Sequence, residues 1–156
     1  MKKRTVLLIL VFVIETMKTF GQIGVGYGND GHTILMSINS PKKIWGELRV
    51  NTRAYNQASW SFSDRGIAQA YVLVNLFTAQ SITLYGGAGI GCNIISNDND
   101  KWASVNLPIG LKANPFAKIS NFYIFGEYDP MIIPKDDVPV IHCVSFGFRF
   151  VLKKAE

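Results

Sequence analysis

The chain has 156 residues, of which 48% are hydrophobic and only 17% are charged, and it contains fourteen glycines. This length suits a single domain, and the composition excludes both a disordered chain and a helical bundle. The formal net charge is +5, but residues 1–21 hold four bases and one acid. Most of the basic excess therefore lies in the N-terminal segment and does not indicate nucleic-acid binding.

Residues 1–21 have the parts of a secretory signal peptide. Lysines and an arginine occupy positions 2–4, an apolar run covers 6–14, and small side chains stand at positions 19 and 21. An apolar run this short cannot span a bilayer, because a membrane helix needs roughly 18 apolar residues. We therefore predict a cleaved signal peptide at 1–21 and a single exported domain at 22–156.

After residue 22, short segments alternate between apolar and polar residues and are separated by turn residues such as Asn29-Asp30-Gly31. A period of two predicts β-strands with two unlike faces. Pro108 lies inside one segment, where we expect a bulge because proline cannot donate a ladder hydrogen bond. The predicted strands are Gln22–Asn29, His32–Ile38, Lys43–Arg53, Gly66–Phe77, Ile82–Ile94, Ala103–Ala113, Asn121–Asp129 and Pro139–Leu152.

The last predicted strand shows the alternation most clearly. From Val144 onward one face carries Arg149 with the small residues Ser145 and Gly147, whereas the other face is entirely apolar. In a soluble protein the apolar face would be the core, and in an outer-membrane barrel it would face lipid. We expect this strand to close the barrel against Ile23–Tyr27 and to act as the assembly signal. The predicted lipid-facing residues are Val144, Phe146, Phe148, Phe150 and Leu152.

Charged residues within the predicted strands all share the face opposite the aliphatic side chains. A narrow barrel is filled by its interior side chains, and buried charges must be paired. We therefore predict a salt-bridged plug inside the barrel, which supports rigidity and not conduction. In this plug we expect pairing of Arg49 and Arg53 with Glu127 and Asp129 in the outer half, and of Arg149 and Lys112 with Glu47 in the inner half.

The connections and the low charge favour a membrane barrel over a soluble one. The connections after the third, fifth and seventh strands are longer than those after the second, fourth and sixth, as in outer-membrane barrels whose long loops lie outside. A soluble barrel would need a charged exterior. Aromatic side chains would form girdles at the two rims: Tyr27 and Tyr128 at one, Phe116, Phe122 and Phe150 at the other.

Two segments could carry chemistry, and each has a simpler interpretation. Gly86–Gly91 resembles a phosphate-binding loop, but no helix follows it, so small residues of a tight barrel wall are favoured. The segment Asn97–Asp100 could bind calcium, but it lacks the glycine and glutamate of a dedicated loop, which favours a solvated turn. Cys92 on the apolar face and Cys143 on the polar face predict two free thiols.

The histidines His32 and His142 could belong to a lipid-modifying enzyme. Ser145 lies three residues after His142, and on a strand this spacing puts the two side chains on opposite faces. A catalytic dyad needs hydrogen-bond reach, so the spacing argues against one. We predict no catalytic residues, no cofactor and no metal ion.

The eight alternating strands, the segment Asn106-Leu-Pro-Ile-Gly-Leu-Lys112 and the closing Phe146-Gly-Phe-Arg-Phe150 resemble small outer-membrane β-barrel proteins of the PorT-like and OmpX-like kind. The resemblance covers Gln22–Leu152. It implies a location in a Gram-negative outer membrane, insertion by the barrel-assembly machinery and no catalytic residues. One departure is the tail, since the chain continues beyond Phe150 to Glu156.

We therefore predict an all-β, eight-stranded, antiparallel up-and-down transmembrane barrel with a structural or surface-interaction role. Outer-membrane lipid would surround it, and an envelope or surface protein could contact its loops at 54–65, 96–102 and 130–138; nucleic acid is not an expected partner. Two alternatives stay open: a secreted soluble barrel that binds a small apolar ligand, and a lipid-modifying outer-membrane enzyme.

Overall fold

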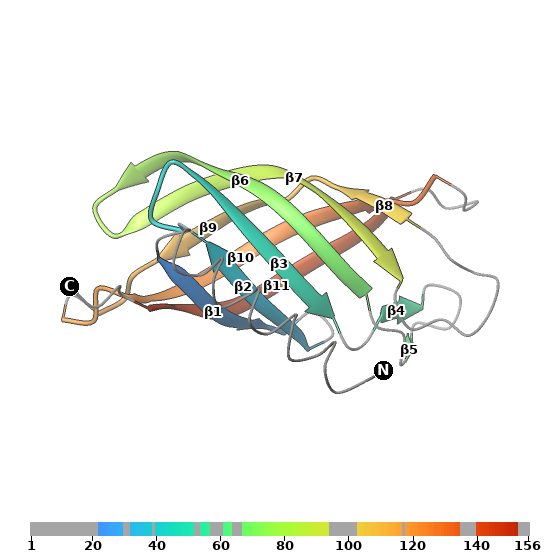
Figure 1. Cartoon of the computed structure of the whole chain (residues 1–156), viewed down its shortest axis with the longest axis horizontal. Coiled ribbons are helices and arrows are strands. Elements are labelled where there is room, and N and C mark those ends of the chain that lie inside the picture. The colour runs from blue at the N-terminus through green and yellow to red at the C-terminus, as the bar shows by residue number, and fades with distance from the viewer. Residues whose placement is uncertain are drawn as a thin grey trace, which may run out of the picture.

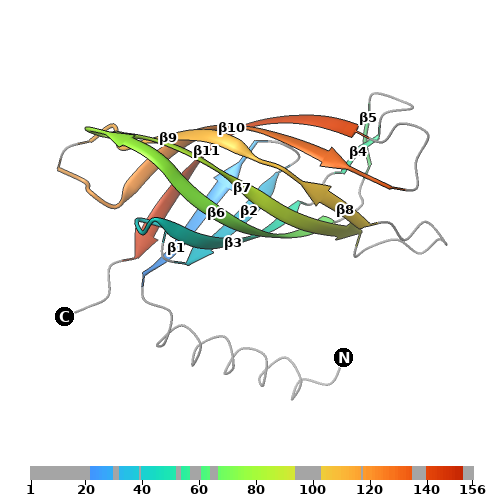
Figure 2. The same cartoon turned by 90° about the horizontal axis from the view of Figure 1, so that it is seen from above.

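The computed structural model describes residues 22–29, 32–38, 40–51, 67–93, 103–116, 118–134 and 140–152, and the backbone of 54–56 and 61–63. The described chain is built from β-strands (Figures 1 and 2). No helix in these ranges is long and apolar enough to cross a membrane. The strands are β1 (Ile23–Gly28), β2 (Thr33–Ile38), β3 (Ile44–Asn51), β4 (Ala54–Asn56), β5 (Ser61–Ser63), β6 (Ile67–Ala79), β7 (Ile82–Asn93), β8 (Ala103–Asn106), β9 (Ile109–Ala113), β10 (Phe122–Ile132) and β11 (Val140–Leu152).

The main sheet closes on itself. Each long strand pairs antiparallel with its neighbour in the chain, and β11 also pairs with β1, so that Ile23 lies opposite Leu152 and Tyr27 opposite Phe148. Strands β8 and β9 both lie between β7 and β10 and together make one stave of the wall. The predicted eight-stranded antiparallel barrel is therefore confirmed, including the closure of the last strand against the first.

Proline interrupts the sixth stave without shifting its register. Asn106 and Ile109 pair with Met131 and Tyr128 of β10, so two residues separate the pairs on each strand. The predicted bulge at Pro108 is therefore wrong. The ladder simply breaks, because proline has no N–H, while the Pro108 carbonyl still accepts a 3.0 Å hydrogen bond from the Gly87 N–H.

A bulge does occur in β6, at a position that the alternation does not reveal. Asn75 pairs with Tyr85 and Phe77 with Leu84, so Leu76 is an extra residue in β6. Two larger differences from the predicted strands also occur. β10 continues through Pro130 to Ile132, and the predicted loop at 54–65 contains the small hairpin of β4 and β5.

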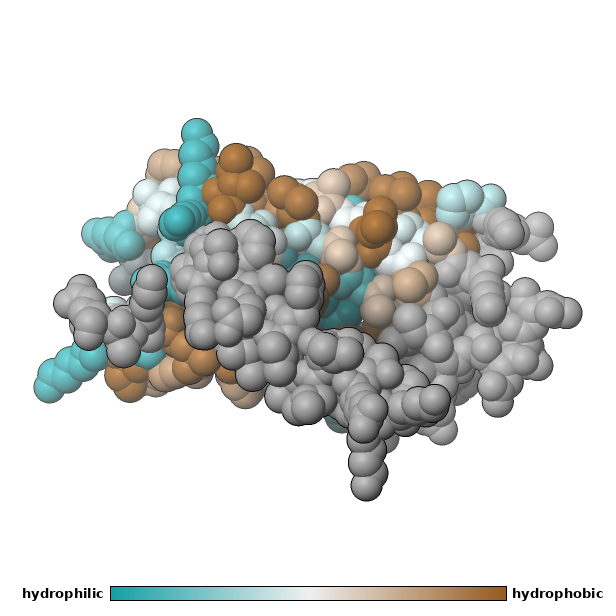
Figure 3. All heavy atoms as spheres, in the orientation of Figure 1, coloured by the Kyte–Doolittle hydropathy of each residue, from teal (hydrophilic) through white to brown (hydrophobic). Residues whose placement is uncertain are grey.

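The two faces of the wall have opposite character. Apolar side chains of the closing strand point outward, with Val144 58% exposed and Phe146 60% exposed, whereas Arg149 on the same strand points inward and is 1% exposed. Figure 3 shows apolar side chains along the upper outline of the barrel. The structure places all five residues of the predicted lipid-facing stripe on this outer face.

The ends of the barrel are distinct. We call the end that holds Ile23 and Leu152 the terminal end, and the opposite end the loop end. The turns between β2 and β3, β6 and β7, and β9 and β10 lie at the terminal end (Figure 1). The longer connections, which lie mostly outside the described residues, leave the loop end.

Candidate functional site

The barrel interior holds a group of charged residues that come from strands far apart in the sequence. Inward-facing positions of β3, β9, β10 and β11 supply them because successive side chains of a strand alternate between the two faces. All of them are at most 6% exposed, and they are Glu47, Arg49, Lys112, Glu127, Asp129 and Arg149. Arg53, the seventh residue predicted for this network, lies outside the described residues.

Glu47 lies between two arginines at the centre of the network. Its Oε1 is 2.7 Å from Arg49 Nε, and its Oε2 is 2.8 Å from Arg149 Nε. Arg149 Nη2 also donates a 3.0 Å hydrogen bond to Glu47 Oε1. One carboxylate on β3 therefore connects a cation on its own strand with a cation on the closing strand.

Arg49 extends the network across the barrel to β10. Its Nη1 and Nη2 atoms lie 2.5 and 2.9 Å from the two oxygens of Glu127, which is a bidentate geometry. Arg49 Nη1 is also 3.7 Å from Asp129 Oδ2. The Tyr85 hydroxyl donates a 2.8 Å hydrogen bond to Glu127 Oε2. These contacts join β3, β7 and β10 through the Arg49 guanidinium group and the Glu127 carboxylate.

Neutral side chains surround Asp129. The Tyr71 hydroxyl donates a 2.6 Å hydrogen bond to its Oδ2 atom, and Asn106 Nδ2 lies 3.3 Å from the same oxygen. Asn106 Nδ2 also donates to the Tyr71 hydroxyl at 3.0 Å, and Ser104 donates to Asn106 Oδ1 at 2.8 Å. Donors from β6 and β8 therefore stabilise a buried carboxylate whose ion pair among the described residues, with Arg49, is 3.7 Å long.

Aromatic rings cover both guanidinium groups. Arg49 Cζ lies 4.1 Å from the centre of the Tyr71 ring, and Arg149 Cζ lies 4.1 Å from the Phe125 ring. The Trp45 and Tyr85 rings are 5.1 and 5.4 Å from Arg149 Cζ. Cation–π contacts of this kind are strongest where water is excluded. The rings therefore stabilise the two guanidinium groups in addition to the carboxylates that pair with them.

Lys112 is placed differently from the prediction, which paired it with Glu47. Its Nζ donates a 2.7 Å hydrogen bond to the Ser40 carbonyl and lies 4.6 Å from the centre of the Trp45 ring. Ser40 belongs to the turn between β2 and β3 at the terminal end. Alternation identified Lys112 as an interior residue, but it could not show that a turn would reach inward to meet it.

Asn75 holds the same turn. Its Nδ2 donates to the Lys42 carbonyl at 2.6 Å, its backbone N–H donates to the Lys43 carbonyl at 2.8 Å, and its Oδ1 accepts from Trp45 Nε1 at 3.1 Å. The side chain of Ser40 is 1% exposed. The turn between β2 and β3, together with Lys112, Trp45 and Asn75, therefore covers the interior at the terminal end.

Replacing Asn75 with alanine should lower the free energy of unfolding by about 1–3 kcal/mol, because it leaves the indole N–H of Trp45 and a turn carbonyl without their partner. Urea unfolding of the folded protein in micelles measures the effect. Thr78→Ala is the matched control: its hydroxyl bonds Thr83 at 3.1 Å at the same end, but in an exposed position. Equal losses in the two variants would show that Asn75 does not hold the turn.

Inward glycines make room for the large interior side chains. A Cβ atom at Gly110 would lie 2.7 Å from the Tyr85 hydroxyl, and one at Gly147 would lie 2.8 Å from the Phe125 ring. Gly89 faces the Tyr71 ring in the same way. The segment Gly86–Gly91 lies within β7, and its inward glycines form part of a tight wall, as its sequence context indicated.

The histidines lie near the loop end and bond to tyrosines. Tyr128 Oη and His142 Nδ1 are 2.6 Å apart, and Tyr27 Oη and His32 Nδ1 are 2.5 Å apart. His142 is exposed on the outer face, whereas Ser145 is 4% exposed in the interior. The prediction that these two side chains point to opposite faces is therefore confirmed. Segment Asn97–Asp100 lies outside the described residues.

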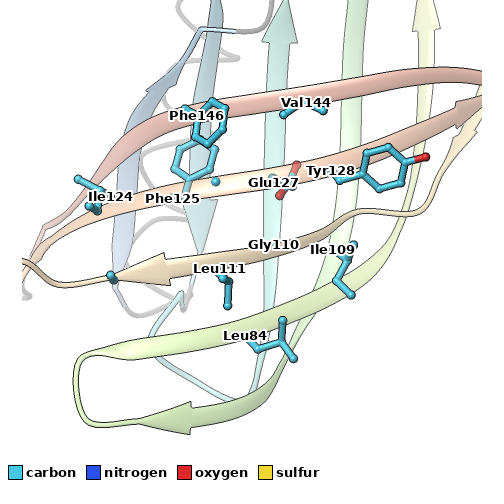
Figure 4. A pocket seen from close by; sticks show the side chains of 12 residues that line it. Leu84, Ile109, Gly110, Leu111, Ile124, Phe125, Glu127, Tyr128, Val144 and Phe146 are labelled. Atoms are coloured by element: carbon cyan, nitrogen blue, oxygen red, sulfur yellow. The ribbon is translucent and has the colours of Figure 1, made fainter.

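Neither cysteine forms a disulfide, as predicted; Cys92 is exposed, and Cys143 packs beside the buried Met131, Ile133 and Ile141. A depression of about 560 Å³ lies on the outer wall and not in the interior (Figure 4). Gly126, which has no side chain, is among the residues that line it, and the Phe146 ring lies 3.1 Å from the position that a Cβ atom at Gly126 would take. The depression is therefore a feature of the apolar outer face.

Several interior residues that support the charges were not predicted as part of the network. The sequence did contain part of this information, because the alternation places Tyr71 and Tyr85 on the same face of the wall as the charged residues. Their partners could not be inferred, since strand pairing alone does not specify which side chains meet across a barrel. The missed residues are Trp45, Tyr71, Tyr85, Ser104, Asn106 and Phe125.

Comparison with known proteins identifies the fold. No protein-family model matches the chain, and no curated protein is significantly similar in sequence. The N-terminal β-barrel domain of OprF from Pseudomonas aeruginosa superposes with a TM-score of 0.56 at 11% sequence identity, over 84% of this chain and 96% of that domain. The chain therefore shares the fold of this small β-barrel domain.

Proposed function

We propose that this chain is an integral outer-membrane protein of the PorT-like or OmpX-like kind, whose filled barrel has a structural or surface-interaction role. The observation that supports this proposal is the division of the wall. Outward side chains such as Ile90, which is 67% exposed, are apolar, whereas the charges are buried within. A folded chain with this exterior needs lipid around it, because in water a large apolar surface would be exposed to solvent.

The interior supports a rigid scaffold more than a channel. Arg49, Glu47, Glu127 and Arg149 form contacts that cross the barrel between facing strands. The Tyr71 and Phe125 rings lie against these guanidinium groups and occupy further space in the barrel interior. We infer that the barrel displays its loops at 54–65, 96–102 and 130–138 to a surface or envelope partner, and that it has no catalytic role.

Two measurements test the proposal. Purified protein folded into phosphatidylcholine vesicles should run faster on an SDS gel before boiling than after boiling, because membrane barrels resist SDS until they are heated. In planar bilayers the same protein should show no large, stable conductance. Recovery of the native protein in an aqueous periplasmic extract would refute membrane insertion, and a stable large conductance would refute the plug while leaving the membrane location intact.

A further inference from the structure

The terminal end of the barrel carries exposed positive charge. Within the described ranges, the exposed residues with a formal charge are Lys42, Lys43 and Lys118, and all three lie in turns at this end. The acids of the described ranges are all in the buried network. By sequence, the connections of the loop end hold more acids than bases. The molecule therefore has a charge asymmetry along the barrel axis.

The turn that carries Lys118 also presents apolar side chains. Phe116 is 51% exposed and Ile119 is 45% exposed. Hydrogen bonds fix the shape of the turn: Asn114 Nδ2 donates to the Ile119 carbonyl at 3.0 Å, and the Ile119 N–H donates to the Phe116 carbonyl at 3.0 Å. These hydrogen bonds join both sides of the turn while Phe116 and Ile119 point outward.

The exposed apolar groups of this turn continue the outer apolar wall. The Phe116 and Phe122 rings have centroids 5.7 Å apart, and Phe122 stacks with Phe148 of the closing strand at 6.1 Å. Lys118 lies two residues beyond Phe116 in the same turn. Apolar side chains next to a cationic one fit the bilayer interface, where rings reach the acyl region and ammonium groups reach the headgroups.

We propose that the turn carrying Phe116, Lys118 and Ile119, with Lys42 and Lys43 of the same rim, binds the headgroups of anionic phospholipid in the inner leaflet of the outer membrane. The inference rests on the proposed function: in an outer-membrane barrel the short turns, which here lie at the terminal end, face the periplasm. A lysine near an anionic lipid surface favours binding by about fivefold. A second copy of the chain is a poorer occupant, because a symmetric contact would bring the same lysines together.

Competitive lipid retention tests the proposal. The folded protein is equilibrated in detergent with equal amounts of phosphatidylglycerol and phosphatidylcholine, purified, and analysed for bound lipid. We expect the wild type to retain phosphatidylglycerol at about fivefold excess or more at low salt. The variant Lys42→Gln, Lys43→Gln, Lys118→Gln should retain the two lipids nearly equally. Lys101→Gln with Lys135→Gln, which changes two loop-end lysines, should leave the excess unchanged.

Three outcomes would overturn the inference: equal retention by the wild type, an equal loss in the loop-end control, or a concentration-dependent dimer that the triple substitution abolishes. Each variant is first checked for the folded gel band in pure phosphatidylcholine vesicles. Failure of the wild type to fold there would refute the proposed function itself. A wild type that folds but shows no preference for phosphatidylglycerol would refute only the lipid site.

Discussion

Replacing Glu47 with glutamine should lower the free energy of unfolding by about 3–5 kcal/mol, because it leaves a buried guanidinium group without its carboxylate. Arg49 keeps its bidentate contact with Glu127, but the ion pair that the structure shows for Arg149 is with Glu47. Arg149 is 1% exposed and cannot turn to solvent. Urea unfolding followed by tryptophan fluorescence measures the loss.

A second substitution separates the lost ion pair from a general loss of packing. In Glu47→Gln combined with Arg149→Met, the stranded charge is removed, so the double variant should be more stable than the single variant by roughly 2 kcal/mol. Asp129→Asn is the matched control. Its amide oxygen can still accept from Tyr71, and its nearest guanidinium nitrogen is 3.7 Å away. A Glu47→Gln loss no larger than that of Asp129→Asn would contradict the central role of Glu47.

Two adjacent glycines in β7 should differ strongly in how much stability they lose when each is replaced with alanine. A Cβ atom at Gly87 would lie 2.8 Å from Leu73 Cδ2 and 2.9 Å from Leu73 Cα, whereas one at Gly86 would make ordinary contacts at 3.4 and 3.5 Å. Gly87→Ala should therefore cost about 1–3 kcal/mol through overpacking, and Gly86→Ala should change stability by less than about 0.5 kcal/mol.

The same unfolding assay compares the two alanine variants. Adding Leu73→Ala to Gly87→Ala should restore little stability, because the added methyl group also approaches backbone atoms of β6, which cannot be shortened. If both single variants unfolded at the same urea concentration as the wild type, the close fit between β6 and β7 would be wrong. Equal destabilisation of both would instead indicate a general need for glycine in this strand.

The alternation of side chains predicted the barrel, its closure and the inward parity of the charged residues, because a period of two is a local property of a strand. Contacts between distant strands were harder to predict. The pairing of Arg49 with Glu127 follows from charge balance in a narrow interior, but the position of Lys112 depends on how a turn folds back. The bulge at Leu76 also left no trace in the alternation, since apolar residues continue on both sides of it.

Rings that sit over inward glycines give the interior a fixed volume, and this has a consequence for how the sequence can diverge. Outward positions contact fluid chains in the proposed membrane location, so leucine, isoleucine and valine can replace one another there at little cost. Inward glycines cannot grow even where the facing ring shrinks, because a Cβ atom at Gly89, Gly110 or Gly147 would also meet a backbone carbonyl oxygen of a neighbouring strand. Among homologous barrels we therefore expect glycine to be retained at positions 89, 110 and 147, while the outward positions exchange aliphatic residues.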